Sequence, residues 1–145
     1  MGFLVKRFEE FSTRELYDLL QVRVSVFVVE QRCPYQELDG KDLVSYHVLY
    51  REHDRIQAYL RVVDPTPGHD GVSIGRVLTC TRGNGSGRAI MEKGIQVARE
   101  KLNADTVHIE AQVYARGFYE RFGFQQTSDA FLEDGIPHIH MLLRL

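Results

Sequence analysis

The sequence predicts an α/β fold in which a mixed sheet is covered by helices on both faces. Segments with strand and helix periodicity alternate along the chain, and paired strand-like segments lie toward both ends. A glycine-rich segment at residues 83–87 separates strand 72–79 from an amphipathic helix in the middle of this pattern. The chain has 145 residues, and we expect residues 1–145 to form one domain around a single core.

The N-terminal part predicts a short strand followed by a helix. Residues 3–8 alternate loosely, and Ser12 and Glu15 have the spacing of a capping box, so the helix is expected to begin there. Apolar residues cover much of this helix's circumference, which predicts that the helix is well buried. Arg23 lies among them and must find a partner or reach solvent. Pro34 is expected to end the helix.

Strands and loops dominate the next segment. Polar residues 51–55 join the predicted strands 46–50 and 56–63 as a hairpin. A loop at 64–71, rich in proline and glycine, leads into strand 72–79.

The C-terminal half predicts a helix, a strand, a short helix and a final pair of strands. One face of the helix after the glycines carries Met91, Ile95, Ala98 and Leu102, which is wide enough to pack on a sheet. Strand 107–112 alternates apolar and polar residues, and a short helix is expected over 115–122. The turn at 133–135 divides the last two strands.

The composition excludes several classes of partner. The net charge is −2 and both signs are mixed along the chain, so we expect neither a nucleic-acid partner nor a membrane surface. The N-terminus has no apolar core of a signal peptide, and no apolar run approaches the ~20 residues that span a bilayer. Cys33 and Cys80 are expected to stay reduced, which favours a cytoplasmic location. We expect no metal site.

The glycine-rich segment has the chemistry of a phosphate site. Gly83, Gly85 and Gly87 permit unusual backbone angles and a close approach of an anion, and the helix that follows offers free amides. No lysine follows the last glycine, as a P-loop requires, and Ile90 stands where a dinucleotide fingerprint needs its third glycine. The pattern that fits is Arg-x-x-Gly-x-Gly from Arg82; the alternative is a flexible turn without a ligand.

Two motifs together indicate a family. The segment 82–87 resembles the pyrophosphate loop of the GNAT superfamily of acetyl-CoA-dependent N-acetyltransferases, and 115–124 matches the GNAT pattern Ala-x-x-x-Tyr-x-x-x-Gly-Phe. Nearly the whole chain resembles the ElaA-type subgroup, through residues 26–35, 39–40, 118–119, 123–124 and 133–138. The resemblance implies the GNAT acyl-CoA N-acyltransferase fold, with a mostly antiparallel central sheet flanked by helices. The segment between Val77 and Arg82 is shorter than in the ElaA pattern.

The resemblance implies acetyl-CoA as cosubstrate. Its pyrophosphate would rest on the amides of residues 83–88, and its pantetheine arm would follow strand 72–79, where an open sheet edge or a splay between this strand and strand 107–112 leaves main-chain groups unpaired. A main-chain amide near Leu78 would polarise the thioester carbonyl. The residues that the resemblance assigns to cofactor binding are Val77, Leu78, Thr79, Arg82, Gly83, Asn84, Gly85, Ser86, Gly87, Arg88, Gln112 and Phe118.

The resemblance also suggests the residues that carry the transfer. Tyr119 would protonate the departing thiolate, because a phenol is still protonated at neutral pH; the alternative is a packing aromatic in an amphipathic helix. Many GNAT enzymes place a glutamate base on the strand before the phosphate loop, and Gly75 stands at the matching position here. Glu110, on the polar face of strand 107–112, is the substitute, acting through water. An ion pair between Glu110 and Arg76 is an equal alternative.

The acceptor is expected to be a small-molecule or peptide amine. Phe27, Glu30 and His138 are assigned to its pocket, and the amine would attack the acetyl group directly. A homodimer is left open as an assembly. The sequence is also consistent with two alternatives. One is an acyl-CoA binding or sensing module without transfer activity, and the other is a protein in which the glycine segment is a plain turn with no cofactor affinity.

Overall fold

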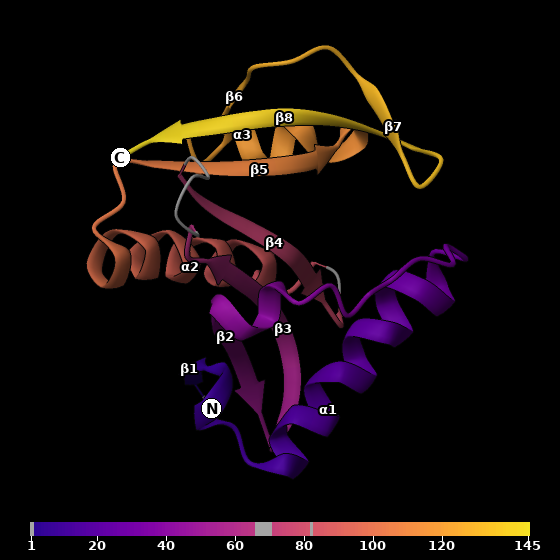
Figure 1. Cartoon of the computed structure of the whole chain (residues 1–145), viewed down its shortest axis with the longest axis vertical. Helices are drawn as coiled ribbons and strands as arrows, with labels where there is room; N and C mark the ends of the chain where they lie inside the picture. Colours follow the sequence, from indigo (N-terminus) through magenta and orange to yellow (C-terminus); the bar gives the residue numbers. More distant parts are fainter. Residues whose placement is uncertain (1, 66–70, 82) are drawn as a thin grey trace.

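The computed structural model describes residues 2–65, 71–81 and 83–145, and in these ranges the strands form one sheet (Figure 1). The sheet order is β1-β2-β3-β4-β5-β8-β6, and β7 pairs with β8 beside β6. The strands are β1 (Gly2–Arg7), β2 (Ser45–Glu52), β3 (Arg55–Val63), β4 (Val72–Thr79), β5 (Thr106–Gln112), β6 (Gln125–Gln126), β7 (Phe131–Glu133) and β8 (Ile136–Arg144).

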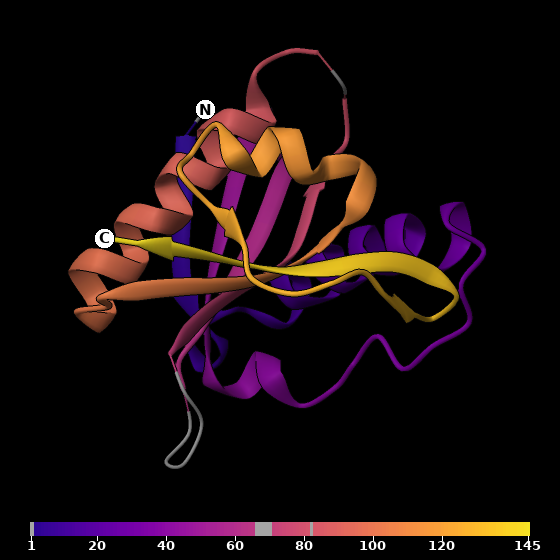
Figure 2. The same ribbon diagram turned by 90° about the horizontal axis from the view of Figure 1, so that it is seen from above.

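The sheet is mixed and mostly antiparallel, as predicted. β4 and β5 run parallel, and every other pair of neighbours in the described sheet is antiparallel. Seen from above, β5 and β8 run across β2 and β3 rather than alongside them, so the sheet twists strongly between its two halves (Figure 2).

Helix α1 (Thr13–Val24) begins where the capping box predicts. Ser12 Oγ accepts a hydrogen bond from the amide of Glu15 at 3.1 Å, and Glu15 Oε1 accepts one from the amide of Ser12 at 2.9 Å. The helix continues as a wider, π-helical segment, Ser25–Glu30, and ends before Pro34.

The prediction that this helix is well buried is wrong. Leu19 and Arg23 are the buried residues of α1, while Tyr17 is 65% exposed and Val29, in the π-helical segment, is 66% exposed. One side of the helix packs on Leu49, Tyr59 and Leu78 of the sheet, and the other side faces outward. Apolar periodicity predicts the packed side but not how little of the helix the sheet covers.

The larger core lies on the opposite face of the sheet, under α2 (Ser86–Leu102) and α3 (Arg116–Glu120). Ile90, Met91, Val97 and Ala98 of α2 are buried against strand residues such as Leu60. Gly94 lets α2 approach closely, because a Cβ there would lie 2.8 Å from the Leu60 side chain. Helices therefore cover both faces, as predicted.

Two tight turns complete the hairpins. His53 and Asp54 join β2 to β3 with positive φ at both residues (51° and 60°), and Asp134 and Gly135 do the same for β7 and β8 (51° and 77°). The short strand β6 was not predicted. Within the described ranges, none of the helices combines the length and apolarity needed to cross a membrane.

Candidate active site

Strands β4 and β5 separate soon after they meet. They pair only at Val72–Val107 and Ser73–His108. Between the β3 pairs Arg61–Gly75 and Tyr59–Leu78, β4 carries one extra residue, and Arg76 there has a φ of 54°. This bulge bends β4 and leaves its later residues without a partner on β5 among the residues that the structure describes.

The N-terminus of α2 lies where β4 ends. Gly85 is the N-cap residue, with a φ of 80°, and has no side chain that could accept a hydrogen bond from the first amides of the helix. The Ser86 amide donates to Asn84 Oδ1 at 3.1 Å. The first intrahelical bond runs from the Ala89 amide to the Gly85 carbonyl at 3.1 Å. In the described part of the chain, the amides of Gly87 and Arg88 have no protein acceptor, so this end of the helix is open to an anion.

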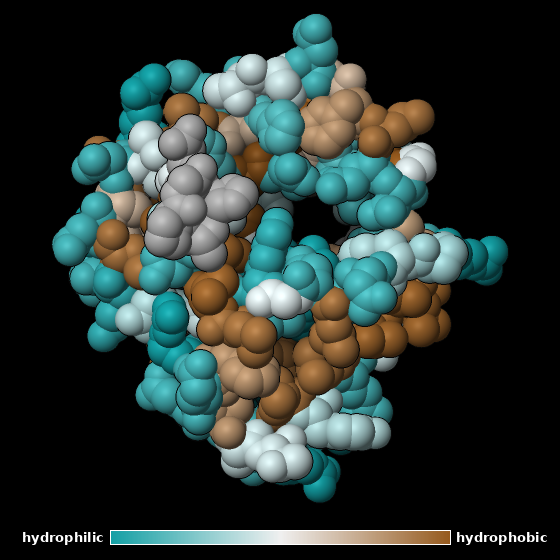
Figure 3. Space-filling view, in the orientation of Figure 1, coloured by the Kyte–Doolittle hydropathy of each residue, from teal (hydrophilic) through white to brown (hydrophobic). Residues whose placement is uncertain are grey.

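A cavity of about 750 Å³ occupies the space between the separated strands. The space-filling view shows it as a hollow between the layer of β5 and β8 and the rest of the molecule, with hydrophilic residues around it (Figure 3). Main-chain or side-chain atoms of Gly75, Arg76 and Val77 line one wall, and Glu110 and Gln112 line the other. The bulge and the splay thus create the cavity; the described residues of 83–88 do not line it, and Gly87 at the start of α2 lies against Thr79 at the end of β4.

Tyr119 reaches this cavity from α3. Its ring packs edge-on against Phe118 and Phe124, at centroid distances of 5.1 and 6.0 Å. Burial raises the pKa of Tyr119 to about 12, with a smaller contribution from Tyr114. The phenol therefore stays protonated throughout the neutral range, so in a proton transfer it can act as an acid but not as a base.

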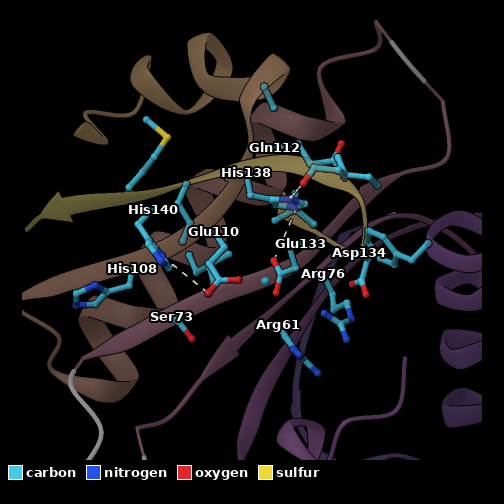
Figure 4. A pocket seen from close by; sticks show the side chains of 18 of the residues that line it. Arg61, Ser73, Arg76, His108, Glu110, Gln112, Glu133, Asp134, His138 and His140 are labelled. Atoms are coloured by element: carbon cyan, nitrogen blue, oxygen red, sulfur yellow. Dashed lines mark hydrogen bonds and ion pairs between the residues drawn. The ribbon is translucent and has the colours of Figure 1, made fainter. Parts of the chain in front are cut away.

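A second group of titratable residues lines the wall formed by β5, β7 and β8. Glu110 and Glu133 point toward one another, with His140 beside Glu110 and His138 beside Glu133 (Figure 4). His140 Nδ1 lies 3.9 Å from Glu110 Oε1, and His138 Nε2 lies 3.9 Å from Glu133 Oε2. Partial burial, followed by hydrogen bonding to and charge on Glu110, raises the pKa of Glu133. No group of three or more His, Cys, Asp or Glu side chains among the described residues is arranged to hold a metal ion.

Below the cavity, the buried guanidinium of Arg23 forms ion pairs with two acidic residues. Its Nε donates to Glu37 Oε2 and its Nη1 to Asp42 Oδ1, both at 2.7 Å. Tyr35 also donates to Glu37. This network ties α1 to the segment that precedes β2.

Two further arginines join the same acidic residues. Arg61 donates to Asp39 at 2.7 and 2.9 Å and to Asp42 at 3.0 Å, and Arg76 contacts Glu37 at 2.9 Å and Asp39 at 3.3 Å. The alternative pairing of Arg76 with Glu110 is therefore wrong. The bulge at Arg76 directs its side chain to the segment 37–39 instead of across to β5.

One donor on the floor of the cavity lacks a partner. Arg61 is 3% exposed, and its Nε is buried without a hydrogen-bond acceptor in the described structure. The Cβ that a side chain at Gly75 would carry lies 3.9 Å from this Nε. The missing side chain at Gly75 leaves room beside the donor.

The structure brings together only part of the predicted site at the cavity. The predicted residues that line it are Phe27, Val77, Glu110, Gln112, Tyr119 and His138. Thr79 and Phe118 lie instead against Gly87, each 3.6 Å from the position of a Cβ there, and Leu78 is buried under α1. Glu30 is exposed and lies near Cys80, whose pKa is raised by burial and by the charge of Glu30. Arg82 lies outside the described residues.

Sequence reasoning missed Glu133, His140 and the arginine cluster. Glu133 was noted as part of a turn and of the segment 133–138 that resembles the ElaA-type subgroup, but not as a site residue, because nothing in the sequence says that β7 and β5 both pair with β8. A signal for the cluster was present in Arg23, a charged residue within an apolar helix, which requires buried acidic partners.

The fold matches that of known acyltransferases. The family model of the acetyltransferase (GNAT) domain matches residues 15–145. The chain belongs to the GNAT acetyltransferase family.

Its relatives include ElaA proteins. Protein ElaA of Escherichia coli (strain K12) is 40% identical over 136 residues, which cover 91% of this chain and 89% of the relative. The crystal structure of E. coli ElaA superposes with a TM-score of 0.92 at 36% identity and 98% coverage of both chains. An acyl-CoA N-acyltransferase from Pseudomonas aeruginosa gives a TM-score of 0.90 at 41% identity, with 97% of both chains covered.

Proposed function

We propose that the protein is an acetyl-CoA-dependent N-acetyltransferase that acts on a primary amine by direct attack. The observation that carries the proposal is the splay of β4 from β5 beside the open N-terminus of α2, with Tyr119 and Glu110 in the cavity between them. Family membership and the similarity to an acyl-CoA N-acyltransferase support the choice of reaction.

The residues present fit a CoA thioester. Free amides of Gly87 and Arg88 at the α2 N-terminus suit a diphosphate, and the unpaired edge of β4 around Val77 suits an amide-bearing arm that adds to the sheet like a strand. When bound, acetyl-CoA supplies an acetyl group activated as a thioester.

The side chains of this chain supply the proton transfers. Glu110, half-exposed and on the cavity wall, accepts a proton from the incoming amine, directly or through water. Tyr119 donates its proton to the leaving thiolate, because the raised pKa of its phenol keeps this proton in place at neutral pH. In the described part of the chain, Cys33 is the cysteine that lines the cavity, and its Sγ is directed to the main-chain carbonyl of Asp134 at 3.6 Å and not to a base. Direct attack by the amine therefore fits better than an acyl-enzyme intermediate.

A two-stage experiment tests the proposal. Thermal unfolding is measured with and without CoA, because a ligand that binds the folded state raises the midpoint. Thiol release from acetyl-CoA is then followed with a panel of polyamines, aminoglycosides and peptides, and acetylated products are identified by mass spectrometry. We expect a higher midpoint and amine-dependent thiol release. CoA binding without transfer to any amine would identify a binding or sensing module, and absence of CoA binding would refute the proposal.

A further inference from the structure

The two glutamates on the cavity wall face one another without a cation between them. Glu110 is on β5 and Glu133 ends β7, and β8 pairs with both strands, so the two carboxyls converge over β8 (Figure 4). Their side chains are 49% and 45% exposed, so both are open to the cavity. Two carboxylates this close repel unless a proton or a cation joins them.

The nearby positive charges are already engaged. Arg61 and Arg76 are hydrogen-bonded to residues of the acidic segment 37–42, and among the described residues neither glutamate forms an ion pair with lysine or arginine. The groups that face Glu133 are Glu110 from β5, His138 from β8 and, at longer range, Arg76 from β4. The histidines lie 3.9 Å away, beyond a strong hydrogen bond. The pair therefore has no cationic side-chain partner, and either a proton, favoured by the raised pKa of Glu133, or the cation of a ligand joins the two carboxyls.

The same cavity contains a second sign of a missing polar ligand. Arg61 Nε is buried, lacks an acceptor in the described structure and lies beside the space at Gly75. A buried donor without a partner is costly, and an oxygen of a ligand or a water in this space would satisfy it. The cavity thus presents carboxylates to a cation and lies beside a buried donor that lacks an acceptor, which suits a polar ligand and not an apolar one.

We propose that Glu133 is a second catalytic residue and that Glu110 and Glu133 together receive the reactive amine as an ammonium ion. The acceptor is then a basic amine that is cationic at neutral pH. This inference rests on the proposed acetyltransferase function and specifies the acceptor class.

The proton balance follows from the pair. The ammonium gives one proton to the carboxylates, and the neutral amine forms the new C–N bond as the C–S bond breaks. The nitrogen loses a second proton to the pair or to water, while Tyr119 supplies the proton that the thiolate takes and recovers its own from solvent. An ammonium and an acetyl thioester thus give an acetamide, a thiol and one released proton.

A pair of amines of similar size separates this role from a structural one. Ethylamine is an ammonium ion at neutral pH, whereas 2,2,2-trifluoroethylamine is mostly neutral. We expect wild-type kcat/KM to be higher for ethylamine. Glu133→Gln should lower kcat/KM for ethylamine about tenfold or more, in line with loss of a charged hydrogen bond, and leave the value for trifluoroethylamine within about twofold. Asp129→Asn, at an exposed position between β6 and β7, is the matched control and should change neither.

Equal losses for both amines, or no loss for either, would overturn the inference. A readout without turnover keeps it separate from the proposed function: with ¹³C-labelled glutamate, ethylammonium chloride should shift the Glu110 and Glu133 carboxyl resonances, and tetramethylammonium chloride at equal ionic strength should not. The Glu133→Gln variant should lose the response. If the shifts appear but no amine is acetylated, the transferase proposal fails while the ammonium site stands; if both salts or neither salt shifts the resonances, the ammonium site fails.

Discussion

At the scale of single residues, the candidate site contains a phenol and two carboxyl groups, which differ in burial and in the groups around them. Tyr119 is packed among aromatic rings, so its phenol has a raised pKa and keeps its proton. Glu110 and Glu133 lie on the open wall of the same cavity, where they can exchange protons with a ligand and water. A proton donor and proton acceptors thus meet at one cavity from different elements.

Replacing Tyr119 by phenylalanine tests the donor. The ring would keep its packing against Phe118 and Phe124, so CoA affinity should not change, while kcat should fall about 100-fold through loss of the acid. Calorimetry with CoA and steady-state thiol release measure the two quantities. Because the pKa of Tyr119 is about 12, wild type should also show no alkaline loss of kcat due to this residue below about pH 11. A variant as active as wild type would remove Tyr119 from this role.

The proposed base can be tested by moving the carboxylate from position 110 to position 75. A side chain there would meet Arg61 Nε at 3.9 Å from its Cβ, and the φ of Gly75 is not positive, so glutamate fits. Glu110→Gln should lower kcat about 100-fold, and adding Gly75→Glu should recover about tenfold, because it restores a carboxylate at the position expected from other GNAT enzymes. Gly75→Gln in the same background is the control. Equal recovery with glutamine would mean that the carboxylate is not acting as a base.

At the scale of elements, the bulge in β4 and the glycine N-cap of α2 each leave main-chain groups unpaired. β4 leaves β5 after Ser73, and α2 begins at Ser86 with two free amides among the described residues. The positive end of the helix dipole adds to these donors. The site therefore depends on backbone conformation as much as on side chains.

The glycine cap can be tested with a matched strain control. Gly85 and Gly40 both have positive φ (80° and 85°), both precede helical turns, and a Cβ at either position meets nothing within 4 Å. Gly85→Val and Gly40→Val should therefore destabilise the fold similarly. Only Gly85→Val should weaken CoA binding, by about tenfold or more, because the Val side chain blocks approach to the amides. Equal affinities of the two variants in calorimetry would place the phosphates elsewhere.

The limits of sequence-based prediction appear at this scale. The capping box at Ser12, the glycine loop and the strand before it were predicted because each rests on local geometry. The position of Glu133 opposite Glu110 depends on β8 lying between β5 and β7, which no local pattern encodes. The direction of Arg76 depends on a bulge, and the exposure of α1 depends on the width of the sheet beneath it.

At the scale of the molecule, the charged network under the cavity joins segments far apart in the chain. Arg23 of α1, Arg61 of β3 and Arg76 of β4 converge on residues 37–42, so the floor of the cavity, α1 and two strands are fixed together. Burying such a network has a large desolvation cost. Removing one partner strongly destabilises the folded state, because a buried charge is then left without its counter-charge.

Removal of Arg23 should show this cost. Arg23→Met fills a similar volume but leaves Glu37 and Asp42 with less positive charge, and we expect the free energy of unfolding to fall by about 3 kcal/mol in urea titrations. Arg14→Met breaks an exposed pair with Asp18 and should change stability by less than about 0.5 kcal/mol. A loss no larger than that of the control would mean that the buried network contributes little.

The same network predicts a pH dependence of stability. Burial acts to raise the pKa of Asp39, but hydrogen bonding to Arg61 and the charges of Arg61 and Arg76 lower it from 3.8 to about 2. Since the folded pKa lies below the unfolded one, this contribution is present above pH 3.8 and is lost as the pH falls toward 2. Asp39→Asn should therefore be less stable than wild type at pH 7, and the difference should shrink at acid pH. A difference that stays constant with pH would contradict the assignment.

The most direct test of the account is a crystal structure with CoA bound. We expect the diphosphate on the amides at the start of α2, around Gly87 and Arg88, and the pantetheine arm along β4 beyond the bulge, with its thiol directed toward Tyr119. A CoA molecule found elsewhere, or a cavity between β4 and β5 that stays free of the arm at saturating CoA, would contradict it.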